Sequence, residues 1–233
     1  IGNLLIPLIL LLFLRAFHEK DSRLSGLGIL FTFTLIYTHH LSTLILLYIL
    51  VGTLLFSVIS FSGHLKIFLS RIISVLFRPT PLILLLLSGL FFFLVVMPTY
   101  IETRAVGTAI GTPTKLTRIG LTFSQITGTS GEVRFTLGII ALILVSAAFR
   151  RSFAASLILA WTLMLFLMTF RPGWVFLDIP SNRIGTYLSF PVSIVGAIGL
   201  AWLIGIFRGH RNSPLSALLL VAVFGYALAS GFT

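Results

Sequence analysis

The chain has 233 residues, of which 58% are hydrophobic and 9% are charged, and its mean hydropathy is +1.14. Soluble domains carry about 25% charged residues, so this composition excludes an ordinary soluble protein. Since a membrane-spanning helix needs roughly 20 apolar residues, the chain has room for about eight spans with short loops and none for a separate soluble domain. A membrane, rather than nucleic acid, then accounts for the net charge of +11.

Apolar runs predict an all-α fold, a polytopic transmembrane helix bundle of about eight spans. The candidate spans cover roughly 2–17, 24–38, 41–62, 79–101, 134–149, 152–170, 185–207 and 214–231. The second and third meet at His39 and His40, a junction so short that they form either a tight hairpin or one broken helix. Because the chain begins with Ile inside an apolar run, we expect residues 1–233 to be one transmembrane bundle that follows further spans of a longer protein.

Basic residues are divided unequally between the two sets of loops. Loops after the first, third, fifth and seventh candidate spans hold ten basic and two acidic residues, and the alternate loops hold six basic and three acidic residues. Cytoplasmic loops are enriched in Lys and Arg, so the first set is predicted to be cytoplasmic. Loops 102–133 and 171–184 are then external, and as the longest loops they are where we expect function. The prediction is a multi-pass protein of a prokaryotic cytoplasmic membrane with its active face external.

The first long loop contains apolar residues at helical spacing, namely Leu116, Ile119, Phe123 and Ile126. This pattern predicts a short amphipathic helix in the membrane interface. The alternative is a Thr- and Gly-rich loop that becomes ordered only with a partner.

Small residues recur every four positions along the seventh candidate span. They are Gly185, Ser189, Ser193, Ala197, Ala201 and Gly205. Because small side chains let helix backbones approach closely, this ridge is predicted to pack against neighbouring helices.

Arg183 and Tyr187 lie one helical turn apart at the external end of the seventh candidate span, and both are predicted to bind substrate. The planar guanidinium of Arg183 suits bidentate binding of a phosphate or pyrophosphate. The alternative for Arg183 is simple snorkelling to the lipid headgroups.

Three further residues are predicted to contact substrate: His39, His40 and Glu102. Neutral imidazoles both donate and accept hydrogen bonds, so the His pair either lines a substrate cavity or caps a broken helix. Glu102 either helps to bind an acceptor or forms a solvated pair with Arg104. No metal site is predicted, because the adjacent histidines diverge on a helix and lack an evident third ligand. The catalytic residues stay unassigned, since motifs of common soluble enzymes are missing.

Two segments carry a family resemblance: residues 37–43 (YTHHLST) at the broken span, and residues 182–191 (NRIGTYLSFP) leading into a Gly- and Ala-rich span. Together with the long outer loop, they resemble the later half of polytopic GT-C-type glycosyltransferases. The resemblance implies that Arg183 faces the phosphate of a polyprenyl or dolichyl carrier. It also implies inverting transfer of a sugar, on the external face, to a glycan, lipid or protein acceptor.

The resemblance places the catalytic Asp or Glu in a first external loop, upstream of this sequence. A divalent metal ion would be held mainly by residues outside the chain. The expected partners are membrane lipid, the lipid-phosphate-linked sugar donor and the acceptor, with no nucleic acid. The rival hypotheses are a transporter or lipid flippase, whose pathway the His pair and Arg183 would line, and a polymerase or ligase of surface polysaccharide.

Overall fold

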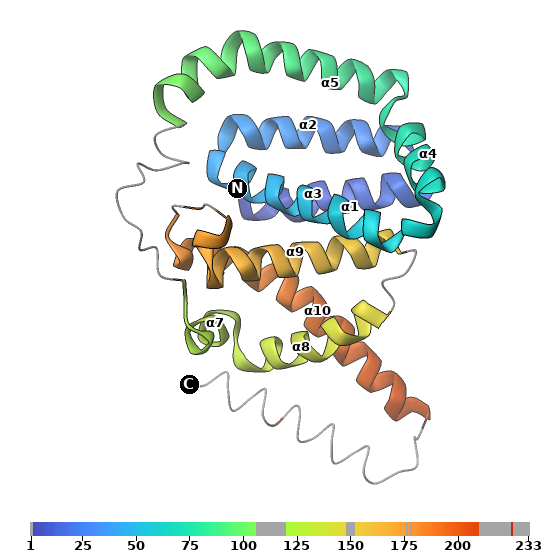
Figure 1. Ribbon diagram of the computed structural model, residues 1–233, viewed down its shortest axis with the longest axis vertical. Coiled ribbons are helices and arrows are strands. Elements are labelled where there is room, and N and C mark those ends of the chain that lie inside the picture. The colour runs from blue at the N-terminus through green and yellow to red at the C-terminus, as the bar shows by residue number, and fades with distance from the viewer. Residues whose placement is uncertain are drawn as a thin grey trace.

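The structure is a computed structural model, which describes residues 2–105, 120–147, 152–175, 177, 179–209 and 225. These residues form helices joined by short connections, with no strand among them, so the all-α prediction is confirmed for them (Figure 1). The α-helices are α1 (Gly2–Glu19), α2 (Ser22–Thr38), α3 (His40–Ser60), α4 (Leu65–Leu76), α5 (Pro79–Phe91), α7 (Phe123–Ser130), α8 (Glu132–Ala147), α9 (Phe153–Phe170) and α10 (Ser181–Gly209). Short 3-10 helices η1 (Ser62–His64) and η3 (Pro172–Val175) occur between them, and α5 continues as the π-helix η2 (Phe92–Ala105).

Four helical stretches in the described parts of the chain are long and apolar enough to cross a membrane: Leu41–Ser60, Pro79–Thr99, Phe153–Phe170 and Ser181–Trp202. Helices α7 and α8, bent by 105° at Gly131, would make a fifth span if they are counted together. These helices identify an integral membrane protein. The count of about eight spans is not confirmed: α1 and α2 occupy the first two predicted positions but do not qualify, and 214–231 lies outside the described residues.

The helices alternate in direction, so that their connections gather at two ends of the bundle (Figure 1). At one end Phe17 of α1 stacks on Phe153 of α9, and Ser25 of α2 donates to the carbonyl of Val75 in α4. We call this end, with residues 15–25, 61–79 and 152–153, the basic end. At the other end the α2–α3 turn lies near residues 120–131 and 170–187, and we call it the His39 end. The described parts of the two predicted sets of loops thus lie at opposite ends.

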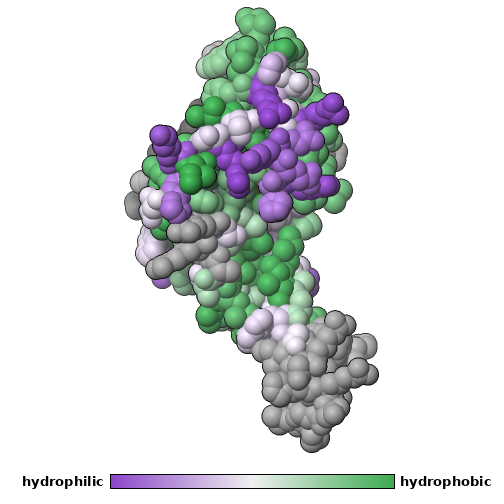
Figure 2. Space-filling model, turned by 90° about the vertical axis from the view of Figure 1, so that its right-hand side faces the viewer, coloured by the Kyte–Doolittle hydropathy of each residue, from purple (hydrophilic) through white to green (hydrophobic). Residues whose placement is uncertain are grey.

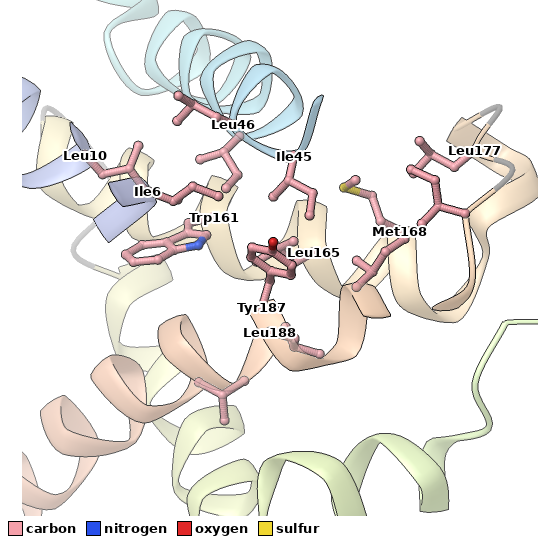
Figure 3. Packing of buried hydrophobic residues seen from close by; sticks show 14 of the residues in the cluster. Ile6, Leu10, Ile45, Leu46, Trp161, Leu165, Met168, Leu177, Tyr187 and Leu188 are labelled. Atoms are coloured by element: carbon pink, nitrogen blue, oxygen red, sulfur yellow. The ribbon is translucent and has the colours of Figure 1, made fainter. Parts of the chain in front are cut away.

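The core joins α1, α3, α9 and α10 through buried apolar side chains. Figure 3 shows Tyr187 of α10 within this cluster, near Ile45 of α3 and Leu165 of α9. Gly52 lies where α3 packs against α9, because a Cβ there would lie 2.7 Å from Cγ of Met164 and 3.4 Å from Cβ of Ala160. A larger residue at position 52 would require the Met164 side chain to move.

The small-residue ridge on α10 does not pack along its full length, so that prediction is wrong for its second half. Gly185 is buried but Ala197 and Ala201 are exposed. A repeat of four residues drifts by about 40° per step around a helix of 3.6 residues per turn, so the ridge rotates away from the bundle. Helix α8 contacts Gly196 and Gly199 instead, and a Cβ on Gly199 would lie 2.9 Å from the carbonyl oxygen of Leu137.

Two helices lie in segments that the sequence assigns to loops. Helix α7 begins at Phe123 with a capping box, in which Thr122 accepts from the Gln125 N–H and the Gln125 side chain accepts from the Thr122 N–H. Ile126 is buried, which agrees with the second half of the predicted amphipathic helix, whereas Leu116 and Ile119 lie outside the described residues. Helix α4 was not predicted, and it crosses the basic end of the bundle (Figure 1).

Candidate functional site

His39 is the single residue between α2 and α3, and its backbone (φ −155°, ψ 84°) reverses the chain. This geometry favours the tight hairpin over the broken helix. The Nδ1 atom of His39 lies 2.9 Å from Oγ of Ser42 and accepts from the Ser42 N–H at 3.4 Å, so His39 caps α3. Because a backbone N–H can only donate, Nδ1 must accept, which places the proton of the neutral ring on Nε2.

Tyr187 extends this interaction across the bundle. Its hydroxyl lies 2.8 Å from Oγ of Ser42, although the two residues are 145 positions apart in the chain. Ser42 is fully buried and Tyr187 is 7% exposed. If the Tyr187 hydroxyl donates to Ser42 and Ser42 donates to His39 Nδ1, both hydroxyl hydrogens are used. The structure thus connects two predicted site residues through Ser42.

Arg183 lies one helical turn before Tyr187, in the first turns of α10. The side chain is exposed, and no described residue pairs with its guanidinium. Its backbone N–H bonds to the carbonyl of Pro180 and to the Asn182 side chain, at 3.0 and 2.9 Å. A cation at the start of a long helix adds to the partial positive charge of the helix terminus, which favours an anionic ligand.

A depression of about 430 Å³ lies between the end of α9 and residues 120–122, near the start of α10. Its lining includes Arg171, whose guanidinium lies 4.9 Å from the ring centroid of Phe170, and the exposed side chain of Trp174. Leu121 connects the depression to α10, since its Cδ1 is 3.3 Å from the Cβ position of Gly185. Arg171 is therefore a second cation at the His39 end.

The exposed aromatic side chains at this end agree with a membrane interface. Trp174 is 74% exposed and Tyr37 is 58% exposed. Trp and Tyr are enriched where a bilayer meets water, because their rings are apolar and their N–H and O–H groups are polar. The polar residues of the site then lie close to the headgroup layer.

Two predicted site residues are not placed, because the side chains of His40 and Glu102 lie outside the described part. Asp178, the acidic residue nearest to Arg183 in the sequence, also lies outside it. No group of three or more His, Cys, Asp or Glu within the described residues could hold a metal ion.

Sequence reasoning missed the roles of Ser42 and Arg171. Ser42 follows His39 by three positions, which is the spacing at which an N-cap side chain accepts a hydrogen bond from the backbone N–H of the third helical residue. The sequence therefore contained a signal for this role of Ser42.

The geometry defines the class of protein: an integral membrane helix bundle with a polar, partly cationic site at one end. Comparison with protein-family models, curated proteins and solved structures gives no match for this chain.

Proposed function

We propose that the His39 end binds the phosphate of a lipid-linked sugar, and that the chain is part of an integral-membrane glycosyltransferase. The observation that carries the proposal is the hydrogen-bonded chain from Tyr187 through Ser42 to His39, one helical turn from the exposed Arg183. Polar and ionisable side chains in membrane helices are costly and commonly mark binding sites. The geometry supports phosphate binding, and the sequence resemblance supports sugar transfer.

Arg183 is the phosphate ligand in this proposal. Its guanidinium donates two parallel hydrogen bonds to phosphate oxygens, and the start of α10 adds a favourable dipole. The hydrogen bonds from Tyr187 through Ser42 to His39 hold the imidazole ring in one orientation and one tautomer, at the same end of the bundle as Arg183.

During transfer, the bond between the anomeric carbon and the phosphate oxygen breaks, and its electron pair stays on the phosphate. An acceptor oxygen forms the new bond to the anomeric carbon, and its proton passes to the upstream carboxylate that the resemblance implies. Arg183 stabilises the negative charge that develops on the departing phosphate.

An apolar cavity of about 140 Å³ supports the placement of the lipid. It lies between α8, α9 and α10, and its lining includes Leu188, the residue after Tyr187. The first isoprene units of a carrier would lie there, while the phosphate stays at the headgroup level with Arg183.

The test is binding of a short-chain polyprenyl phosphate to the protein in detergent micelles, with the unphosphorylated polyprenol as the ligand control. Arg183→Ala should weaken phosphate binding at least about tenfold, and Arg183→Lys should be intermediate because Lys lacks the planar fork. Equal affinity of the wild type, Arg183→Lys and Arg183→Ala for the phosphate would contradict the proposed site.

Two tyrosine variants provide a matched comparison. Tyr48, like Tyr187, uses its hydroxyl at the His39 end, where it donates to the carbonyl of Val175 at 2.7 Å. Each Tyr→Phe change removes one hydroxyl, but only Tyr187→Phe takes a hydroxyl out of the hydrogen-bonded chain that ends at His39. Tyr187→Phe should therefore weaken phosphate binding and Tyr48→Phe should not. Equal losses in both variants would assign Tyr187 a structural role only.

A further inference from the structure

A large cavity lies away from the proposed site. Its volume is about 560 Å³, and it extends between α2, α3 and α5 to α4 at the basic end. Thr32 and Thr53 line it, but their hydroxyls donate to the carbonyls of Gly28 and Ile49 in their own helices, each at 2.7 Å. The remaining lining is almost entirely apolar, and the volume lies within the range of roughly 300–1,000 Å³ that is usual for ligand sites. A hydrocarbon chain suits such a cavity.

A cation lies at the basic end of the cavity. The guanidinium carbon of Arg71 is 5.4 Å from the ring centroid of Phe17, and Phe17 lines the cavity. Phe17 in turn stacks on Phe153 with ring centroids 4.2 Å apart. The next residue after Arg71, Ile72, also lines the cavity. One turn of α4 therefore presents an apolar wall and a positive charge side by side.

The surface around Arg71 is strongly basic. The described residues of this end include six Lys or Arg side chains, Arg15, Lys20, Arg23, Lys66, Arg71 and Arg78, and two carboxylates. Both carboxylates bind within their own segment: Glu19 accepts from Arg15 Nε, and Asp21 accepts from the Arg23 N–H, each at 2.8 Å. Figure 2 shows the hydrophilic residues gathered on this face. The excess positive charge is complementary to an anionic headgroup.

We infer that this cavity binds one acyl chain of an anionic phospholipid, whose phosphate lies against Arg71. The apolar cavity accounts for the chain, and Arg71 with the surrounding basic surface accounts for the preference for a negative headgroup. Helix α4 lies across the end of the bundle, as an interfacial helix does, which places Arg71 at headgroup depth. This site is independent of the proposed sugar-carrier site, because it uses the opposite end.

The first test measures lipid bound per protein by mass spectrometry of intact complexes from mixed micelles. The probes are dioleoyl phosphatidylglycerol and dioleoyl phosphatidylcholine, which share their chains. We expect preferential binding of phosphatidylglycerol, and a loss of at least about fivefold in Arg71→Ala. Arg23→Ala removes the same charge from the same end and should retain binding. Equal binding of the two lipids, or equal loss in both variants, would overturn the proposal in favour of general surface attraction.

The second test fills the cavity. Gly89 of α5 lines it, and a Cβ there would meet no atom within 4 Å, so the side chain of Gly89→Leu would begin in open space beside the cavity. Gly205 of α10 is also helical and open, but lies outside the cavity. Gly89→Leu should reduce phosphatidylglycerol binding at least about fivefold, and Gly205→Leu should not. Unchanged binding in a folded Gly89→Leu protein, with wild-type thermal stability, would show that no chain enters the cavity.

Discussion

Substitutions of Ser42 and Tyr187 should be energetically coupled, and their hydrogen bonds predict that the two single variants lose different amounts of stability. Tyr187→Phe leaves Ser42 able to donate to His39, so it removes one hydrogen bond and orphans no group. Ser42→Ala instead leaves the buried Tyr187 hydroxyl without this partner, and a buried unsatisfied polar group costs about 1–3 kcal/mol. Ser42→Ala should therefore destabilise the protein more than Tyr187→Phe.

The double variant separates this explanation from simple loss of packing. In the Ser42→Ala background, Tyr187→Phe removes a hydroxyl that is already orphaned, so it should be neutral or stabilising. The expected coupling is about 0.6–1.7 kcal/mol, which runs from the average to the largest value for hydrogen bonds between membrane helices. It can be measured from denaturant titrations in detergent micelles, followed by circular dichroism. The control pair is Ser42→Ala with Tyr48→Phe, whose effects should add because Tyr48 bonds to Val175. Additive effects of Ser42→Ala and Tyr187→Phe would refute the reasoning.

Three further predictions concern the fold. Gly120→Ala should lower the free energy of unfolding by about 2–4 kcal/mol, because its Cβ would overlap the Phe170 carbonyl group and displace the Leu121 N–H from the Thr169 carbonyl. The control is Gly173→Ala, whose Cβ would lie in open space. Equal melting temperatures of the two variants would contradict this packing. Gly199→Leu should destabilise the protein by about 1–3 kcal/mol, because Gly199 contacts α8, whereas Ala197→Leu should be tolerated because Ala197 is exposed. If Ala197→Leu lowers the melting temperature more than Gly199→Leu does, the small-residue ridge is the packing face after all. Cysteines introduced at positions 66 and 173 of this cysteine-free chain should react with an impermeant thiol reagent from opposite sides of the membrane, with position 66 cytoplasmic; labelling of both from one side would contradict the alternating bundle.

The sequence predicts most of the helices because continuous apolar runs are a strong signal for them. Helix α4 was not predicted, because its 12 residues are too few to span a bilayer and basic residues occur within it and just after it, namely Lys66, Arg71 and Arg78. The signal was nevertheless present, as Phe68, Ile72 and Val75 recur at helical spacing. A search for amphipathic periods inside basic loops would have found it.

One part of the candidate site can be predicted from neighbouring residues in the sequence, and the other part depends on contacts between distant residues. The role of His39 as a cap follows from its position at a break between apolar runs, with Ser42 three residues later. The partnership of Ser42 with Tyr187 does not follow, because residues 145 positions apart meet only through the packing of α10 in the core. The prediction that the α10 ridge packs along its whole length is wrong for a different reason. Residues four positions apart were treated as one helix face, although a repeat of four turns gradually around the helix and away from the bundle.

The one-residue turn at His39 has a consequence for how the protein is made. Helices α2 and α3 are joined by one residue, so they form as one hairpin, since no polar linker separates them. His39 caps α3 as soon as this hairpin closes, so the His39–Ser42 half of the site forms before α10 is synthesised. Tyr187 emerges from the ribosome 145 residues after Ser42. Until α10 is inserted, the Ser42 hydroxyl lacks the contact with Tyr187, and the arrival of α10 both completes the core and assembles the polar chain.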